Sequence, residues 1–174
     1  LLGSHDTARL RTLVGGDAVS VRLAMLAMIT LPGAPCIYYG DEIGMAGRHD
    51  PDCRRAFPWD ESRWDRALLD YVKAALALRR EQPALRGGEY RTLAAAGEAV
   101  AYARADGARS AVVMINAGSG EASLEVAVPE LGGAALQAVA LPASAAPQVE
   151  VLGEGRWRIS LAGRSGAVLL GSPG

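Results

Sequence analysis

The sequence lacks the features that are typical of nucleic-acid-binding, membrane-spanning and secreted proteins. It has no basic block and no acidic tail, and its formal net charge is −1, which argues against a nucleic-acid partner. Its longest apolar run, about residues 23–31, stops at Pro32-Gly33 and is too short to cross a bilayer. The sequence shows neither the charged n-region nor the apolar h-region of a secretory signal peptide before its first loop. We therefore expect neither a nucleic acid nor a membrane as partner.

Cysteine is scarce, and metal-ligand patterns are absent. Cys36 and Cys53 lack the close spacing of a zinc site. We interpret them as two reduced thiols, with a disulfide as the alternative, and reduced thiols are compatible with the cytoplasmic location that we expect. His49 beside Asp50 and Asp52 matches no ligand spacing that we recognise, so it is interpreted as solvated loop charge. We expect no metal and no cofactor.

The chain also lacks an initial methionine. It opens in what looks like an apolar strand, Leu1-Leu2, and runs at once into a loop that carries His5, Asp6 and Arg9. A natural chain seldom begins this way. The start predicts the C-terminal part of a longer enzyme, cut at an active-site loop.

What is present divides into two parts. Half of the 174 residues are hydrophobic, enough for the core of one ordinary domain or two small ones. The order of helix, strand, loop and helix in residues 10–86 is typical of the end of an α/β barrel or a doubly wound fold. The expected elements are a helix over Ala18–Thr30 capped by Asp17, a strand over Ala34–Tyr39, a loop over 44–60 and a helix over 62–80.

After Gly87-Gly88 the period changes to short alternating stretches separated by turn residues, which predicts an antiparallel β-sandwich. The sequence therefore predicts two domains, residues 1–87 and residues 88–174. The expected strands are 89–93, 99–104, 111–116, 122–128, 136–141, 149–152, 156–161 and 167–170.

The residues that could carry chemistry lie in the first loop. His5-Asp6 follows an apolar segment and precedes a helix, and in a barrel the C-terminal ends of the strands carry the chemistry. A carboxylate there can accept hydrogen bonds from sugar hydroxyls, a neighbouring imidazole can donate one, and Arg9 can keep the carboxylate ionised. Taken alone, the residues fit a structural ion pair equally well.

Three segments resemble one family. Residues 2–9, Leu-Gly-Ser-His-Asp-Thr-Ala-Arg, resemble the fourth signature segment of the alpha-amylase family of glycoside hydrolases. Residues 33–44 resemble that family's segment at the eighth barrel strand. Asp-Pro-Asp-Cys-Arg at 50–54, followed by Phe-Pro-Trp at 57–59, is similar to the branch that holds neopullulanase, cyclomaltodextrinase, maltogenic amylase and maltodextrin glucosidase. The resemblance covers residues 1–88, and the second half carries no motif.

The resemblance implies a (β/α)8 TIM barrel whose seventh strand ends near Leu2 and whose eighth is about Cys36–Tyr39. It implies retaining hydrolysis of α-1,4-glucosidic bonds in maltodextrins, cyclodextrins or pullulan. Such hydrolysis needs a nucleophile and a general acid about 5 Å apart. The family takes them from an Asp after the fourth strand and a Glu after the fifth, and neither segment occurs here. We therefore expect the chain to be inactive alone.

The resemblance also implies roles for single residues. Asp6 matches the family's third carboxylate, a catalytic residue that binds the sugar being cleaved and favours its transition state. His5 and Arg9 beside it, and Asp50 with Arg54 at the non-reducing end, are the implied substrate-binding residues, and a maltodextrin-type oligosaccharide is the implied partner. A homodimer is implied only for a full-length enzyme, through an N-terminal domain that this sequence lacks.

A different class of function remains open, in which the second half is a carbohydrate-binding or a purely structural module. Its aromatic residues, Tyr90, Tyr102 and Trp157, are poor material for a sugar-binding platform, and Trp157 alternates with apolar neighbours as a core residue does. In the first half, Trp59 and Trp64 could stack on sugars, but Trp59 is expected to pack the loop and Trp64 to join the helix core.

Overall fold

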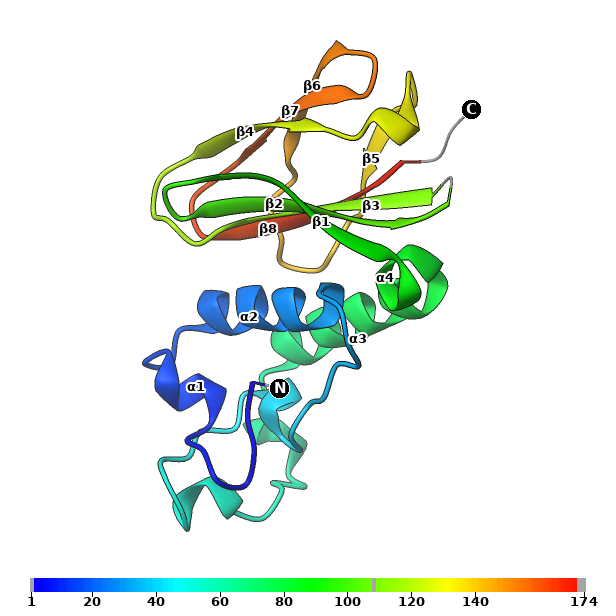
Figure 1. Cartoon of the computed structure of the whole chain (residues 1–174). Helices are drawn as coiled ribbons and strands as arrows, with labels where there is room; N and C mark the ends of the chain where they lie inside the picture. The colour runs from blue at the N-terminus through cyan, green and yellow to red at the C-terminus, as the bar shows by residue number, and fades with distance from the viewer. Residues whose placement is uncertain (1, 108, 172–174) are drawn as a thin grey trace.

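The computed structural model describes residues 2–107 and 109–171, with a helical half below a β half (Figure 1). The α-helices are α1 Leu10–Leu13, α2 Ala18–Thr30, α3 Arg66–Glu81 and α4 Pro83–Gly87. The 3-10 helices are η1 Asp41–Ile43, η2 Asp52–Arg54, η3 Glu61–Arg63 and η4 Pro129–Leu131. The strands are β1 Glu89–Ala96, β2 Ala99–Asp106, β3 Arg109–Asn116, β4 Ala122–Ala127, β5 Leu136–Ala138, β6 Gln148–Gly153, β7 Arg156–Leu161 and β8 Ser165–Gly171.

Helix α2 begins and ends where the sequence predicts. The Asp17 carboxylate accepts hydrogen bonds from the backbone amides of Val19 at 3.4 Å and Ser20 at 2.9 Å, which satisfies two of the free N–H groups of the first turn. The helix ends at Thr30 because Leu31 precedes a proline and takes an extended conformation. Within the described residues, no helix is both long and apolar enough to span a bilayer.

Helix α3 starts four residues later than the predicted position 62. Residues 61–63 form the separate turn η3, and the Asp65 side chain then caps α3 by accepting a hydrogen bond from the Leu68 amide at 3.0 Å. The apolar face of α3 is buried at Leu68, Val72 and Ala75, and Leu76 is half-buried.

The predicted strand over Ala34–Tyr39 is not formed as β-structure. These residues join no sheet, and neither does Leu2, the expected end of a preceding strand. A strand is held by hydrogen bonds to a neighbouring strand, and the described residues place none beside this segment. The barrel implied by the resemblance therefore stays a prediction.

All eight strands predicted after residue 88 are present, with bounds that differ by up to three residues. They form two sheets, ordered β1-β2-β3-β8-β5 and β4-β7-β6, and every pairing is antiparallel. The two sheets face each other across a core of apolar side chains. Trp157 is 1% exposed in that core, which confirms its predicted position.

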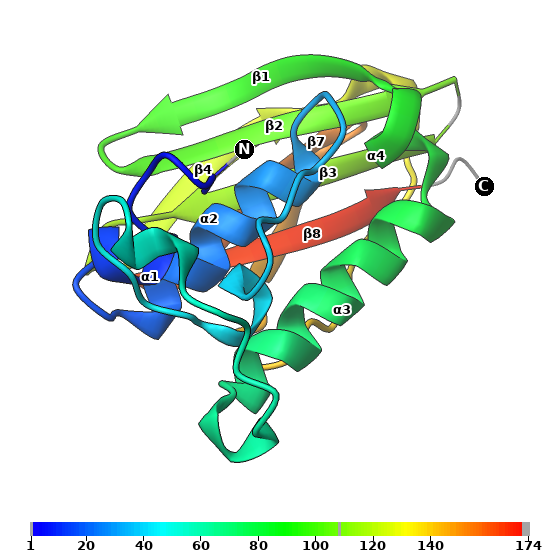
Figure 2. The same ribbon diagram turned by 90° about the horizontal axis from the view of Figure 1, so that it is seen from below.

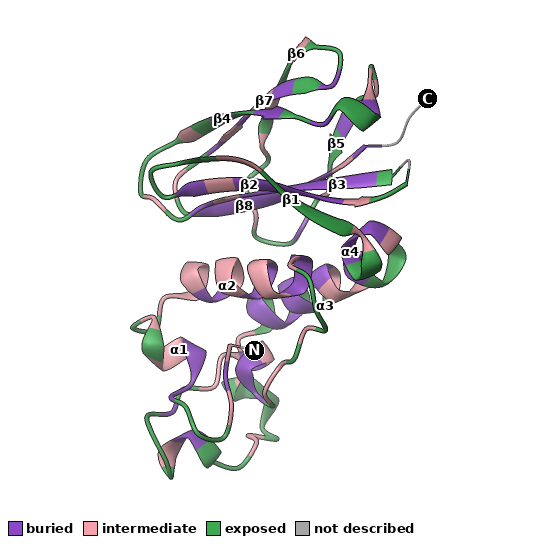
Figure 3. Ribbon diagram, viewed as in Figure 1, coloured by how far each residue is buried: buried purple, intermediate pink, exposed green. Residues whose placement is uncertain are grey.

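The helices cover the outer face of the larger sheet, and Figure 2 shows α2 and α3 lying across it. One buried cluster combines Leu26 and Ile29 of α2 with Tyr102, Val113 and Val168 of the sheet. The buried residues in Figure 3 accordingly line both sides of this contact. The helical and β halves therefore share a hydrophobic core.

Candidate functional site

Two loops meet in the helical half and bring the predicted site residues together. We call residues 4–9 the first loop and residues 47–55 the second loop. The first loop is shaped locally, since the Ser4 amide donates to Thr7 Oγ1 and the Asp6 amide donates to Ser4 Oγ, both at 3.1 Å. These bonds turn the backbone so that His5 and Asp6 stand at the surface.

Four of the predicted residues form one cluster. The His5 Nε2 atom lies 3.2 Å from Asp6 Oδ2, and Arg54 Nη2 lies 3.1 Å from Asp6 Oδ1. The Arg54 Nε atom lies 2.6 Å from Asp50 Oδ1, so one guanidinium joins the two aspartates. The side chains of all four are between 47% and 68% exposed, and a ligand can reach them.

The cluster contributes little to stability. Ion pairs between exposed groups are worth about 0–1 kcal/mol, because water and salt screen them. The side chains therefore lose little by exchanging their protein partners for those of a ligand. Two carboxylates, an imidazole and a guanidinium offer both acceptors and donors, as the hydroxyls of a sugar require.

Arg9 does not pair with Asp6 as the sequence reasoning expected. Its side chain is 1% exposed, and its guanidinium lies over the Tyr38 ring at 4.1 Å from the ring centre. Its Nη1 atom pairs with Asp41 Oδ1 at 3.2 Å. The expected pairing is wrong because Arg9, at the start of α1, points inward, and Arg54 of the second loop takes its place. The predicted contact of Arg9 with substrate would require this buried side chain to leave its partners.

Asp41 is the buried counterpart of Arg9. The carboxyl is 4% exposed, and burial raises its pKa above the ordinary value, while the hydrogen bond and charge of Arg9 act in the opposite direction. Neighbouring Glu42 has a buried Oε2 atom with no hydrogen-bond partner among the described residues. The Arg9–Asp41 pair therefore anchors the interior beneath the exposed cluster.

The sequence reasoning missed contacts that shape the second loop. The Asp52 carboxylate accepts a 2.6 Å hydrogen bond from the Arg48 amide and pairs with Arg55 at 2.6 Å. The Arg48 amide is the main reason that the pKa of Asp52 is lowered. Tyr39 Oη donates to the Arg55 carbonyl at 2.9 Å. The signal available in the sequence was the i,i+3 spacing of Asp52 and Arg55, which permits such pairing.

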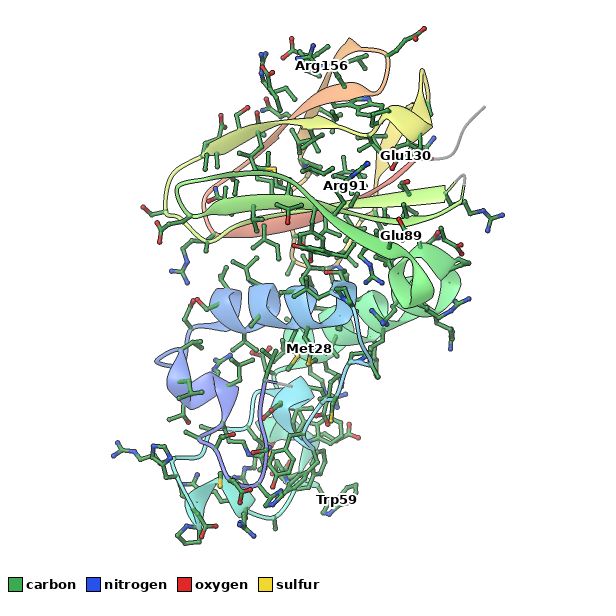
Figure 4. The ribbon with its side chains drawn as sticks, in the orientation of Figure 1. Met28, Trp59, Glu89, Arg91, Glu130 and Arg156 are labelled. Atoms are coloured by element: carbon green, nitrogen blue, oxygen red, sulfur yellow. The ribbon has the colours of Figure 1, made fainter. Side chains whose placement is uncertain are left out.

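Trp59 and Trp64 follow the second loop. Trp59 is 82% exposed, and Figure 4 shows it projecting from the chain, so the expectation that it packs the loop is wrong. Its ring lies 4.9 Å from that of Phe57. Trp64 precedes α3 and donates from Nε1 to the Pro58 carbonyl at 2.6 Å, which fixes the turn between them.

No group of three or more metal-ligating side chains gathers in the part of the chain that the structure describes. His49 is exposed, and its carbonyl accepts a hydrogen bond from the Asp52 amide at 2.9 Å. Both cysteines are free thiols, as predicted, with Cys36 exposed and Cys53 buried.

Comparison with known sequences gives a family match for the helical half. The family profile described as "Alpha amylase, catalytic domain" matches residues 1–80. This range contains every predicted site residue and all of the cluster around Asp6.

Curated relatives and a solved structure extend the match. The chain is 43% identical over 134 residues to a cyclomaltodextrinase of Geobacillus thermopakistaniensis, covering 76% of this chain and 23% of that protein. It is 43% identical over 136 residues to neopullulanase 2 of Thermoactinomyces vulgaris, again covering 76% and 23%. A debranching enzyme of Nostoc punctiforme superimposes with a TM-score of 0.86 at 39% identity, over 98% of this chain and 35% of that structure. The chain thus spans about a quarter of these curated relatives.

Proposed function

The chain belongs to the alpha-amylase family of glycoside hydrolases, and from this we propose that it forms part of a retaining enzyme that cleaves α-1,4-glucosidic bonds. The observation that carries the proposal is the cluster in which Arg54 joins Asp6 to Asp50 beside His5. The names of the relatives, cyclomaltodextrinase and neopullulanase, favour maltodextrins, cyclodextrins or pullulan as substrates.

Asp6 is the residue that we propose for transition-state stabilisation. Its exposed carboxylate can accept hydrogen bonds from hydroxyls of the sugar at the cleavage point, and His5 can donate a further one. These bonds strengthen as the sugar ring gains positive charge, so they favour the transition state over the bound substrate. Asp50 and Arg54, on the other side of the cluster, would hold a neighbouring sugar.

The nucleophile and the general acid would come from outside this chain. Asp41 cannot serve as nucleophile in this arrangement, because its carboxylate is buried and paired with Arg9. Nothing in the sequence resembles the two family segments that carry these groups. We therefore propose that the chain alone does not hydrolyse maltodextrins, and measurable turnover of a chromogenic maltoside by the pure chain would contradict this.

The substitution Asp6→Asn in the complete enzyme tests the role of Asp6. It keeps the shape and removes the charge, and a loss of about 3–4 kcal/mol of transition-state stabilisation lowers the rate roughly 10²–10³-fold. We expect kcat and kcat/KM to fall together, because the contact is made mainly in the transition state. A variant in which only KM rises would show that Asp6 binds substrate uniformly, and the assignment would be wrong.

For the β half we propose a structural role rather than carbohydrate binding. Arg104 Nη1 donates to the Thr30 carbonyl at 2.6 Å, and Tyr102 Oη lies 2.6 Å from Thr30 Oγ1, both at the end of α2. Arg164 contacts Asp17 at the other end of α2. Calorimetry of the whole chain with a maltooligosaccharide separates the two roles, since binding that persists after Asp6→Asn and Asp50→Ala would favour the carbohydrate-binding alternative.

The two free thiols are compatible with a reducing compartment, which supports our proposal of a cytoplasmic enzyme. A homodimer formed through a domain outside this chain stays a prediction of the resemblance. Size-exclusion chromatography of the complete enzyme, with and without that domain, tests it.

A further inference from the structure

The first and second loops hold each other by reciprocal contacts from side chain to backbone. Arg9 of the first loop donates from Nε to the Cys53 carbonyl at 2.9 Å. Cys53 of the second loop directs its thiol at the His5 carbonyl, with Sγ 3.1 Å from the oxygen. Arg54 Nε donates to the same carbonyl at 3.0 Å. We call the Arg9–Cys53–His5 set the loop clasp.

The loop clasp is more buried than the cluster, since the bond from Arg9 to Cys53 is buried and the bond from Cys53 to His5 is partly buried. Cys53 is 0% exposed and Arg9 1%, whereas the Asp6 side chain is 68% exposed. A buried hydrogen bond is costly to break, because the groups that it leaves behind find no water. The first loop is therefore held in place at Arg9, while Asp6 stays accessible to solvent.

The backbones of the two loops are also in close contact. The Arg9 amide donates to the Gly47 carbonyl at 2.8 Å. A Cβ atom at Gly47 would lie 2.7 Å from the Asp52 carbonyl oxygen and 3.1 Å from Cys53 Cα, so only glycine fits without a shift of the backbone. The position of the second loop therefore sets the position of the first.

We propose that Cys53 is a positioning residue for the hydrolysis, acting through the His5 carbonyl on the adjacent Asp6. This inference rests on the proposed function. The buried thiol contacts the backbone carbonyl of His5 and not the side chains of the cluster, so it helps to hold the backbone from which His5 and Asp6 project. Displacement of a catalytic group by about 1 Å can lower a rate by about 10²-fold, so a small shift of this backbone has a large effect.

The kinetic test compares Cys53→Ala with Cys53→Ser in the complete enzyme. Alanine removes the thiol donor and leaves the His5 carbonyl with Arg54 Nε alone, whereas serine keeps a second donor in nearly the same place. We expect Cys53→Ala to lower kcat by about 5- to 20-fold with KM changed less than about twofold, because Asp6 acts mainly in the transition state. Cys53→Ser should retain most of the kcat. Cys36→Ala is the matched control, since Cys36 is the exposed cysteine of the chain and should leave the rate unchanged.

A second measurement needs no substrate. Treatment with N-ethylmaleimide followed by mass spectrometry reports the modification of each cysteine separately. In this chain, where Cys36 is exposed, Cys36 should react quickly and Cys53 should be protected. Arg9→Lys keeps a cation that can pair with Asp41 but removes the Nε donor to the Cys53 carbonyl. The loss of this hydrogen bond should raise the modification rate of Cys53 about tenfold without affecting Cys36.

The outcomes separate this inference from the proposed function. A folded Cys53→Ala enzyme with unchanged kcat, or a Cys53→Ser enzyme as slow as the alanine variant, would overturn the positioning role. Labelling of Cys53 as fast as that of Cys36 would overturn the loop clasp itself. If Cys53→Ala does not fold, the kcat of Cys53→Ser and the modification rate of Cys53 test the inference instead. A protected Cys53 in an enzyme with no activity on any α-glucan would refute the proposed function and leave the clasp standing.

Discussion

The end of α2 gives the sharpest test of how the two halves of the chain are joined. Arg104 of β2 is 1% exposed and donates to the Thr30 carbonyl at 2.6 Å and to the Gly88 carbonyl at 2.9 Å from Nη2. Arg79 of α3 donates to the Ile29 carbonyl at 2.5 Å and to the Gly33 carbonyl at 2.6 Å. Two cations therefore satisfy the carbonyls of Ile29 and Thr30, two of the four that α2 leaves free at its C-terminus.

The perturbation is Arg104→Met, which keeps much of the apolar stem and removes the guanidinium. Burial lowers the pKa of Arg104 from its ordinary value, as does the charge of nearby Arg79, so the buried cation carries a cost of its own. Loss of the donors leaves the carbonyls of Thr30 and Gly88 without these partners, and each buried unsatisfied group costs about 1–3 kcal/mol. The substitution also removes the cost of burying a charge, which offsets part of this loss. We therefore expect the free energy of unfolding to fall by about 2–4 kcal/mol.

The assay is thermal unfolding followed by circular dichroism. For a chain of this length about 1 kcal/mol corresponds to about 2–4 °C, so the melting temperature of Arg104→Met should fall by about 4–16 °C. Arg156→Met is the matched control, because Arg156 lies exposed on β7 and its pair with Glu125 spans 3.6 Å (Figure 4). It should shift the melting temperature by about 2 °C or less. If Arg104→Met is no more destabilising than Arg156→Met, the hydrogen bonds of Arg104 do not stabilise the end of α2 as we argue.

Three further predictions address the cluster, the cap of α2 and the contact between the halves. In the complete enzyme, Asp50→Ala should raise KM more than it lowers kcat, because Asp50 is proposed to touch a sugar remote from the cleaved bond; steady-state kinetics with equal losses in kcat and kcat/KM would argue against that. The hydrogen bonds from Ser20 lower the pKa of Asp17, so its capping contribution is present above the unfolded pKa near 3.8 and is lost as pH falls through the lower folded pKa. Thermal unfolding between pH 6 and pH 2.5 should therefore show a smaller loss for Asp17→Asn than for the wild type, and equal losses would contradict the cap. Gly166→Ala places a Cβ atom 2.7 Å from Leu26 Cδ2 in the shared core and should cost about 1–3 kcal/mol in chemical denaturation, whereas Gly133→Ala, with nothing within 4 Å, should cost much less.

Much of the local structure could be predicted because it depends on neighbours in the sequence. Asp17 caps α2 through amides two and three residues ahead, and the alternation around Trp157 places that side chain between the sheets. The predicted strand at residues 34–39 fails for the opposite reason. An apolar run predicts a strand only if another strand is available to pair with it, and pairing is a property of the whole fold.

Most helices and strands and the resemblance to the alpha-amylase family could be predicted from the sequence, because periodicity, caps and motifs depend on residues close together along the chain. The sequence also singled out His5, Asp6, Asp50 and Arg54 as site residues, and their contact supports that choice without testing their roles.

Which arginine faces Asp6 could not be predicted from the sequence, because it depends on contacts between distant residues. Arg9 stands three residues from Asp6 in the chain, yet its guanidinium turns inward to Asp41, 32 residues later, and to the Cys53 carbonyl, 44 residues later. Arg54, 48 residues from Asp6, takes the surface position instead. The direction of a long side chain is set by the partners that bury or pair it, and folding alone brings those partners together.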